Sequence, residues 1–302
     1  MSTRKIDQNE LVVFIDAKPA EIIDVTKDIF LCFTGVTASF NVPFEYKQFK
    51  KTRSNWRKIR TVTKLKKQIQ DGHFDIKAIS LVGKMNGHYV RWACDSLNHA
   101  YTKIGAEWTI ENDQPKSLSW KGHIFELKHA LGISIYSSML AIIGLRFAIF
   151  AKNQQKYEKL LFVLDNLPID SAAGMELMKA ISMTSDNLEM WKRNLEYEVT
   201  FQIANLASYS NEHIINVPGK EHPIGILSDW LSVSSLAKIN PKQVKVESGF
   251  SDKDIDRFVE LWEAVNSRRS FDLINVDDPE VINKVKANEK KRTTRVKDDK
   301  TT

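Results

Sequence analysis

The sequence predicts an α/β protein in which helices cover a mixed sheet. Residues 11–16 and 159–165 are apolar runs that each end in an aspartate, a pattern typical of strands buried on both faces. Residues 29–39 are rich in β-branched and aromatic side chains and follow the first run after a short polar loop, which favours an antiparallel hairpin. Segments of helical periodicity follow these strands, so strands and helices share one fold.

The other elements are predicted from periodicity and turn residues. Residues 44–69 repeat apolar side chains at intervals of three, four or seven and predict a helix, and residues 74–82 predict a third strand. Residues 111–119 contain Pro115 and no periodicity, which predicts a loop before a long helix at 123–154. Further predictions are helices at 88–104, 171–181, 222–239 and 251–268, the last with a Ser251–Asp254 capping box, and a half-buried strand at 197–204.

A chain of 302 residues is long enough for one elaborated α/β domain or two smaller ones. We divide it into a main domain at 1–240, a helical extension at 241–283 and a tail at 284–302. The tail is polar, rich in lysine and arginine and without periodicity, so we expect it to be a disordered basic segment.

The cysteines and the apolar segments bear on location. Cys32 and Cys94 show no metal-ligand spacing and make no disulfide framework, and the first ten residues are polar, so we expect a reducing, cytoplasmic environment. Residues 131–151 are long enough to span a membrane, but Arg146 would cost about 3 kcal/mol at its centre. We therefore expect a helix buried inside the protein and no membrane partner.

The net charge of +6 is unevenly distributed. Between Lys47 and Lys67 there are ten lysine or arginine residues and no acidic residue, so polyanions such as nucleic acid are the natural partner. The alternative is a solvated charged face, although no acidic partner is available one helical turn away. The candidate nucleic-acid contacts are Lys50, Arg53, Arg57, Lys58 and Lys64.

Two aspartates at strand ends suggest a metal site. If the strands at 11–16 and 159–165 are parallel neighbours, Asp16 and Asp165 face one another at the carboxyl edge of the sheet, where α/β proteins bind ligands. Adjacent carboxylates repel unless a cation lies between them, and hard oxygen ligands suit Mg²⁺ or Mn²⁺. The alternative is that each aspartate only ends a strand and caps a turn.

The order of elements resembles the ribonuclease H-like fold, and four short motifs resemble one branch of it. The chain reads F-I-D-A-K-P, F-L-C-F-T-G-V-T, V-L-D-N and I-L-S-D-W-L. These are similar to motifs of an uncharacterised bacterial and phage family of ribonuclease H-like proteins, whose first strand ends I-D-E-S-G and whose late helix reads Q-x-A-D. The resemblance covers about half of the chain by element order. Ala17 and Lys18 depart from it, and no glutamine stands three residues before Asp229.

The resemblance implies that Asp16, Asp165 and Asp229 are catalytic metal ligands, and that the long helix contributes a fourth carboxylate, for which Glu126 is the candidate. An exposed glutamate at a helix start is the alternative for Glu126. A competing alignment places residues 202–205, Q-I-A-N, at the Q-x-A-D position, which would make Asn205 the third ligand of an inactive site. We prefer Asp229 because residues 197–204 alternate as a strand.

Two functions follow from the resemblance and the charge. The first is a metal-dependent nuclease that hydrolyses phosphodiester bonds in DNA or RNA, with Mg²⁺ or Mn²⁺ as cofactor. The second is an inactive relative that binds nucleic acid or a protein partner through the same basic surface. A homo-oligomer is a further alternative. Glycine-rich phosphate loops, G-x-S-x-G and H-E-x-x-H are absent from the sequence, so other common hydrolase sites are not indicated.

Overall fold

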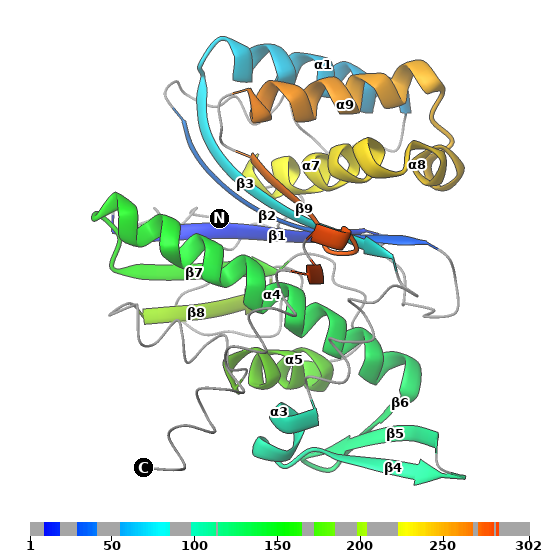
Figure 1. Ribbon diagram of the computed structural model, residues 1–302. Coiled ribbons are helices and arrows are strands. Elements are labelled where there is room, and N and C mark those ends of the chain that lie inside the picture. Colours follow the sequence, from blue (N-terminus) through cyan, green and yellow to red (C-terminus); the bar gives the residue numbers. More distant parts are fainter. Residues whose placement is uncertain are drawn as a thin grey trace.

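A six-stranded mixed sheet of order β8-β7-β1-β2-β3-β9 forms the centre of the protein (Figure 1). Its strands are β1 (Glu10–Lys18), β2 (Phe30–Phe40), β3 (Phe74–Lys84), β7 (Lys159–Leu164), β8 (Glu198–Ile203) and β9 (Phe271–Asn275). The computed structural model describes residues 9–18, 29–40, 55–84, 98–112, 114–164, 172–184, 198–203, 223–267, 271–280 and 282–283.

The strand directions confirm an α/β protein with a mixed sheet. β1, β2 and β3 pair antiparallel in succession, whereas β7 lies parallel to both β1 and β8. All five expected strands are present. The sixth strand, β9, pairs parallel to β3 and was not predicted, because its five residues carry little periodicity and become a strand through pairing with a distant partner.

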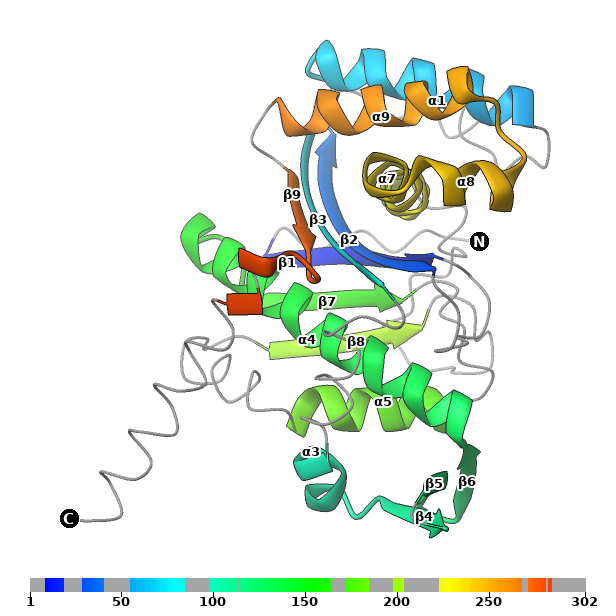
Figure 2. The same cartoon turned by 45° about the vertical axis from the view of Figure 1, so that its right-hand side comes forward.

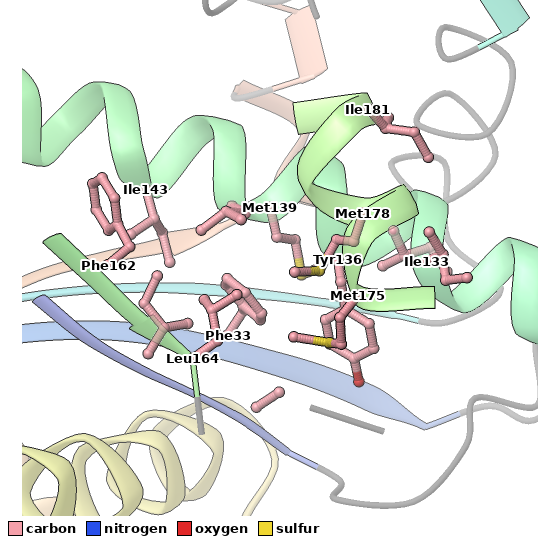
Figure 3. Packing of buried hydrophobic residues seen from close by; sticks show 14 of the residues in the cluster. Phe33, Ile133, Tyr136, Met139, Ile143, Phe162, Leu164, Met175, Met178 and Ile181 are labelled. Atoms are coloured by element: carbon pink, nitrogen blue, oxygen red, sulfur yellow. The ribbon is translucent and has the colours of Figure 1, made fainter. Parts of the chain in front are cut away.

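One face of the sheet is covered by α4 (Leu127–Gln154), against which α5 (Ala172–Thr184) packs. Figure 3 shows Phe33 of β2 and Phe162 of β7 meeting Tyr136, Met139 and Ile143 of α4. α4 is long and apolar enough to cross a membrane, but 72% of its most apolar stretch of 18 residues is buried. The prediction of a helix buried inside the protein is confirmed.

The other face is covered by α7 (Pro223–Ile239), which is itself covered by α9 (Asp252–Asn266) (Figure 2). α7 is apolar on nearly all sides because it is buried between the sheet and α9. α1 (Asn55–Gln70) packs against α9, and α8 (Pro241–Ser248) connects α7 to α9. Ser251 and Asp254 form the predicted capping box of α9.

A small antiparallel sheet of β4 (Glu107–Glu111), β5 (Gln114–Trp120) and β6 (His123–Glu126) precedes α4. The predicted loop at 111–119 is therefore wrong over most of its length. Leu118 and Trp120 alternate with exposed or half-buried residues and fill the inner face of β5. β6 pairs with β5 only from Ser117 onward, so Pro115 lies where one side of β5 is open and its missing N–H is tolerated.

The start of the long helix was also predicted too early. Lys121 and Gly122 both have positive φ, 46° and 79°, which is the geometry of a two-residue hairpin turn. This turn makes residues 123–126 a strand, and α4 begins at Leu127. Of the helix predicted at 88–104, the structure describes α3 (Asn98–Lys103). Residues 44–54 of the first predicted helix lie outside the described residues.

Candidate acidic site

Asp16 and Lys18 occupy the carboxyl end of β1 and point to the same face of the sheet. Side chains two residues apart in a strand share a face, and Val12 and Phe14 place this face against α7. Asp16 is 1% exposed, although carboxylates are rarely buried this far without a charged partner. A carboxylate as buried as Asp16 is therefore expected to have a cation close to it.

α7 delivers a second carboxylate to the same place. Lys18 Nζ lies 2.5 Å from Asp229 Oδ1 and 3.3 Å from Asp16 Oδ2, so one ammonium group joins the end of β1 to α7. The side chain of Asp229 is 42% exposed, that of Lys18 is 21% exposed and that of Asp16 is 2% exposed. We call these three residues the acidic site, which runs from the buried face of the sheet to solvent.

The electrostatics of the acidic site favour the charged form of Lys18. Burial lowers the pKa of Lys18, but the nearby negative charges of Asp16 and Asp229 outweigh burial and hold this pKa above its ordinary value. Lys18 is therefore a cation across the physiological range. With two carboxylates and one ammonium group, the three side chains carry one excess negative charge.

A row of hydroxyl groups continues from Asp16 across the sheet beneath α7. Asp16 pairs with Thr34 in β2, and Thr34 pairs with Ser80 in β3. The Thr34 and Ser80 oxygens are 2.6 Å apart, and the Ser235 oxygen of α7 lies 2.8 Å from Ser80. These hydroxyls are buried and satisfy one another, so α7 is fixed over β1 to β3 by polar contacts as well as apolar packing.

The structure brings together two of the three predicted aspartates and leaves the third undescribed. Asp16 and Asp229 meet through Lys18. β7 is described up to Leu164, which pairs with Ile15 of β1. The residues that follow this pair in the sequence are Asp16 after Ile15 and Asp165 after Leu164. Asp165 itself lies outside the described residues, as does Asn205, the competing third ligand.

Glu126 is not brought to the acidic site. It is the last residue of β6, and its side chain is 75% exposed and lies 3.5 Å from Lys128. Figures 1 and 2 show β6 at the opposite end of the molecule from the layer that contains α7. The geometry agrees with the alternative for Glu126, an exposed glutamate just before a helix.

The basic helix is positioned by an acidic one. α1 packs against α9, and Lys66 Nζ lies 2.7 Å from Glu260 of α9. α1 has no acidic residue of its own, so Glu260 of α9 supplies the acidic partner of Lys66. This ion pair neutralises part of the positive charge of α1. Lys64 is exposed on α1. Lys50 and Arg53 lie outside the described residues, as do the side chains of Arg57 and Lys58.

The donors of the acidic site match a hard divalent cation in chemistry. Asp16 and Asp229 supply carboxylate oxygens that already contact one cation, the ammonium group of Lys18. Among the residues that the structure describes, which exclude Asp165, no group of three or more His, Cys, Asp or Glu is placed to hold a metal ion. Asp16 and Asp229 would supply two of the three carboxylates that the resemblance implies for a metal ion, and both already contact the ammonium group of Lys18.

Sequence reasoning noted Lys18 only as a departure from a motif. Its spacing of two from Asp16 was a usable signal, because residues 16 and 18 of one strand must share a face. Thr34 and Ser80 were missed as well. Both are hydroxyl residues inside strands, but their alignment with Asp16 depends on the register of three strands, which the sequence does not reveal.

Comparisons with family models, with curated proteins and with solved structures gave no match for this chain.

Proposed function

We propose that this chain is a ribonuclease H-like protein that hydrolyses phosphodiester bonds in DNA or RNA with Mg²⁺ or Mn²⁺. In the fold that the sequence resembles, carboxylates of the first strand, the fourth strand and a late helix hold the ions. Here the corresponding strands, β1 and β7, are parallel neighbours, and the late helix α7 packs against β1. This arrangement supports such a domain, but its boundary does not fall at residue 240. β9 (271–275) belongs to the same central sheet, so residues 241–283 are part of this fold and not a separate helical extension.

The observation that carries the proposal is the contact of Asp16 and Asp229 with one cationic group. The two residues are far apart in the sequence, yet their carboxylates lie within 3.3 Å and 2.5 Å of the same nitrogen. Carboxylates gathered around one point attract cations, and the exposed side of Asp229 leaves a route from solvent.

In the proposed reaction, Asp16, Asp229 and Asp165 hold the ions through carboxylate oxygens. The bound ions would activate a water molecule and stabilise the leaving oxygen of the phosphodiester. The role of the chain is then to fix the ligands. β1 holds Asp16 in the core, and the Thr34–Ser80–Ser235 contacts hold α7, and with it Asp229, over the sheet.

The test measures cleavage of labelled single-stranded and double-stranded DNA and RNA in Mn²⁺ and in EDTA. We expect cleavage only with the ion, and its loss in Asp16→Asn, Asp165→Asn and Asp229→Asn, because asparagine keeps the size but removes the charge that binds a divalent ion. Asp272→Asn is a matched control, since Asp272 is 41% exposed and pairs with Lys77. An Asp229→Asn variant that cuts like wild type would refute the assignment.

A second candidate function is favoured by Lys18. Its ammonium group contacts both Asp16 and Asp229 and offsets one of their two negative charges, so the acidic site already has a cation without a metal ion. This is expected of a catalytically inactive relative that binds nucleic acid or a protein partner. The measurement that separates the two functions is Mn²⁺ binding by calorimetry. A wild-type protein that binds no Mn²⁺ and cuts no substrate supports the inactive relative.

A further inference from the structure

We propose that Lys18 is the resident cation of the acidic site, and that a divalent ion binds Asp16 and Asp229 only by displacing its ammonium group. This inference rests on the proposed function, because it concerns how the same site is loaded. It assigns to Lys18 control over metal affinity, a role that neither the motifs nor the charge pattern indicates.

The first argument is steric and electrostatic. Lys18 Nζ contacts both Asp229 Oδ1, at 2.5 Å, and Asp16 Oδ2, at 3.3 Å. Mg²⁺ and Mn²⁺ bind carboxylate oxygens at about 2.1 Å, so an ion shared by these two oxygens would occupy nearly the same volume as the ammonium group. Two positive groups at this separation also repel strongly where Asp16 is buried.

The second argument is that the ammonium group of Lys18 can move from the acidic site into solvent. Its side chain is 21% exposed, and Asp229, its nearer partner, is 42% exposed. A lysine has four flexible carbons and a strongly hydrated end, so its ammonium group can rotate toward solvent while its stem stays against the protein. The buried Asp16 would then keep one cationic partner in either state, ammonium or metal ion.

If a metal ion exchanges with the ammonium group, removing the charge of Lys18 should destabilise the metal-free protein and strengthen Mn²⁺ binding. In the metal-free protein Lys18 compensates a buried carboxylate, so removing its charge lowers the melting temperature. In the presence of Mn²⁺ the same removal eliminates a competitor and tightens binding. A lysine with only a structural role would lower the melting temperature without tightening Mn²⁺ binding.

The experiment compares wild type, Lys18→Met, Lys18→Arg and Lys77→Met as full chains. Lys77 is a matched control, because its side chain is 19% exposed and lies 2.9 Å from Asp272, a half-exposed carboxylate outside the acidic site. Calorimetry gives the dissociation constant for Mn²⁺ alone, and thermal melts are recorded in EDTA and in Mn²⁺. Lys18→Gln replaces Lys18→Met if the latter does not fold.

We expect Lys18→Met to bind Mn²⁺ at least tenfold more tightly than wild type and to melt at a lower temperature in EDTA, with the loss recovered in Mn²⁺. Lys18→Arg and Lys77→Met should keep the wild-type affinity. Equal Mn²⁺ affinities for wild type and Lys18→Met would overturn the inference and leave the proposed metal site standing.

Two other outcomes bear on both the inference and the proposed function. Binding by Lys18→Met but not by wild type would overturn the exchange, because Lys18 would then be a resident cation that Mn²⁺ does not displace, and it would also refute metal-dependent activity of the natural chain. Binding by neither protein would overturn both, because no divalent site would exist for Lys18 to occupy.

Discussion

The contact between Lys18 and Asp16 should stabilise the folded protein more than the contact between Lys18 and Asp229, although it is the longer of the two. The nitrogen-to-oxygen distances are 3.3 Å and 2.5 Å, and distance alone would favour Asp229. The side chains differ in solvent exposure, at 2% for Asp16 and 42% for Asp229. Solvent screening should therefore decide the order.

The magnitudes follow from Coulomb's law with the screening appropriate to each side chain. At an effective dielectric constant of ~20, the Lys18–Asp16 attraction is ~5 kcal/mol, whereas at ~80 the Lys18–Asp229 attraction is ~1.7 kcal/mol. Measured values are smaller because the groups keep part of their hydration. We expect coupling free energies of about 2 to 3 kcal/mol for Asp16 and under about 1 kcal/mol for Asp229.

Double-mutant cycles measure these couplings directly. Lys18→Met is combined with Asp16→Asn in one cycle and with Asp229→Asn in the other, and free energies of unfolding come from urea titrations in EDTA. Lys77→Met with Asp272→Asn forms a third cycle at nearly the same exposures as the Asp229 pair, and it should give a similar small value. A larger coupling for Asp229 than for Asp16 would refute the reasoning, and so would a Lys18–Asp16 coupling that 1 M salt removes.

Three further predictions test the packing, the buried thiol and the basic helix. Gly35→Ala should cost about 1 to 3 kcal/mol in urea unfolding, because its Cβ would lie 2.8 Å from both Ile143 and Phe147 of α4; a cost under about 0.5 kcal/mol would contradict this close packing. Burial raises the pKa of the Cys32 thiol from 9.0 to about 12, so in the native protein the thiol should resist iodoacetamide at pH 8. The contribution of the buried thiol to the free energy of unfolding should be lost as the pH rises from 9 to 12. Rapid labelling of the Cys32 peptide in the native protein would contradict the raised pKa. The double substitution Lys64→Glu and Lys67→Glu should weaken nucleic-acid binding and reduce the slope of log affinity against log salt concentration by about two units. The control Lys242→Glu in α8 should change neither quantity. Unchanged affinity of the double variant would mean that the charge of α1 serves solubility and the contact with α9.

The strands buried on both faces could be predicted because their signal is local. An unbroken run such as 160–164 is apolar whatever its neighbours are, and it ends where the sequence becomes polar. β5 and β9 were missed because their signal is not local. Pro115 is acceptable in β5 only because β6 stops short of it, and β9 is defined by its pairing with β3.

The candidate site divides in the same way. The meeting of Asp16 with Asp229 was expected from a resemblance in element order, and their contacts with one nitrogen agree with it. The role of Lys18 and the alignment of Thr34 with Ser80 require the register of β1, β2 and β3 and the position of α7. Such facts belong to the packed structure, because a one-residue slip of a strand would turn each of these side chains to the opposite face.

The pairing of β9 with β3 has a consequence for how the chain assembles. Residues 78–82 of β3, A-I-S-L-V, pair on their outer side with residues 271–275, which are synthesised much later. Until β9 arrives, an apolar strand presents unpaired backbone groups, and such an edge can recruit a strand of another molecule. A chain that stops at Ser267 should therefore aggregate through β3 even where its helices have formed, and a nascent chain has the same hazard during translation.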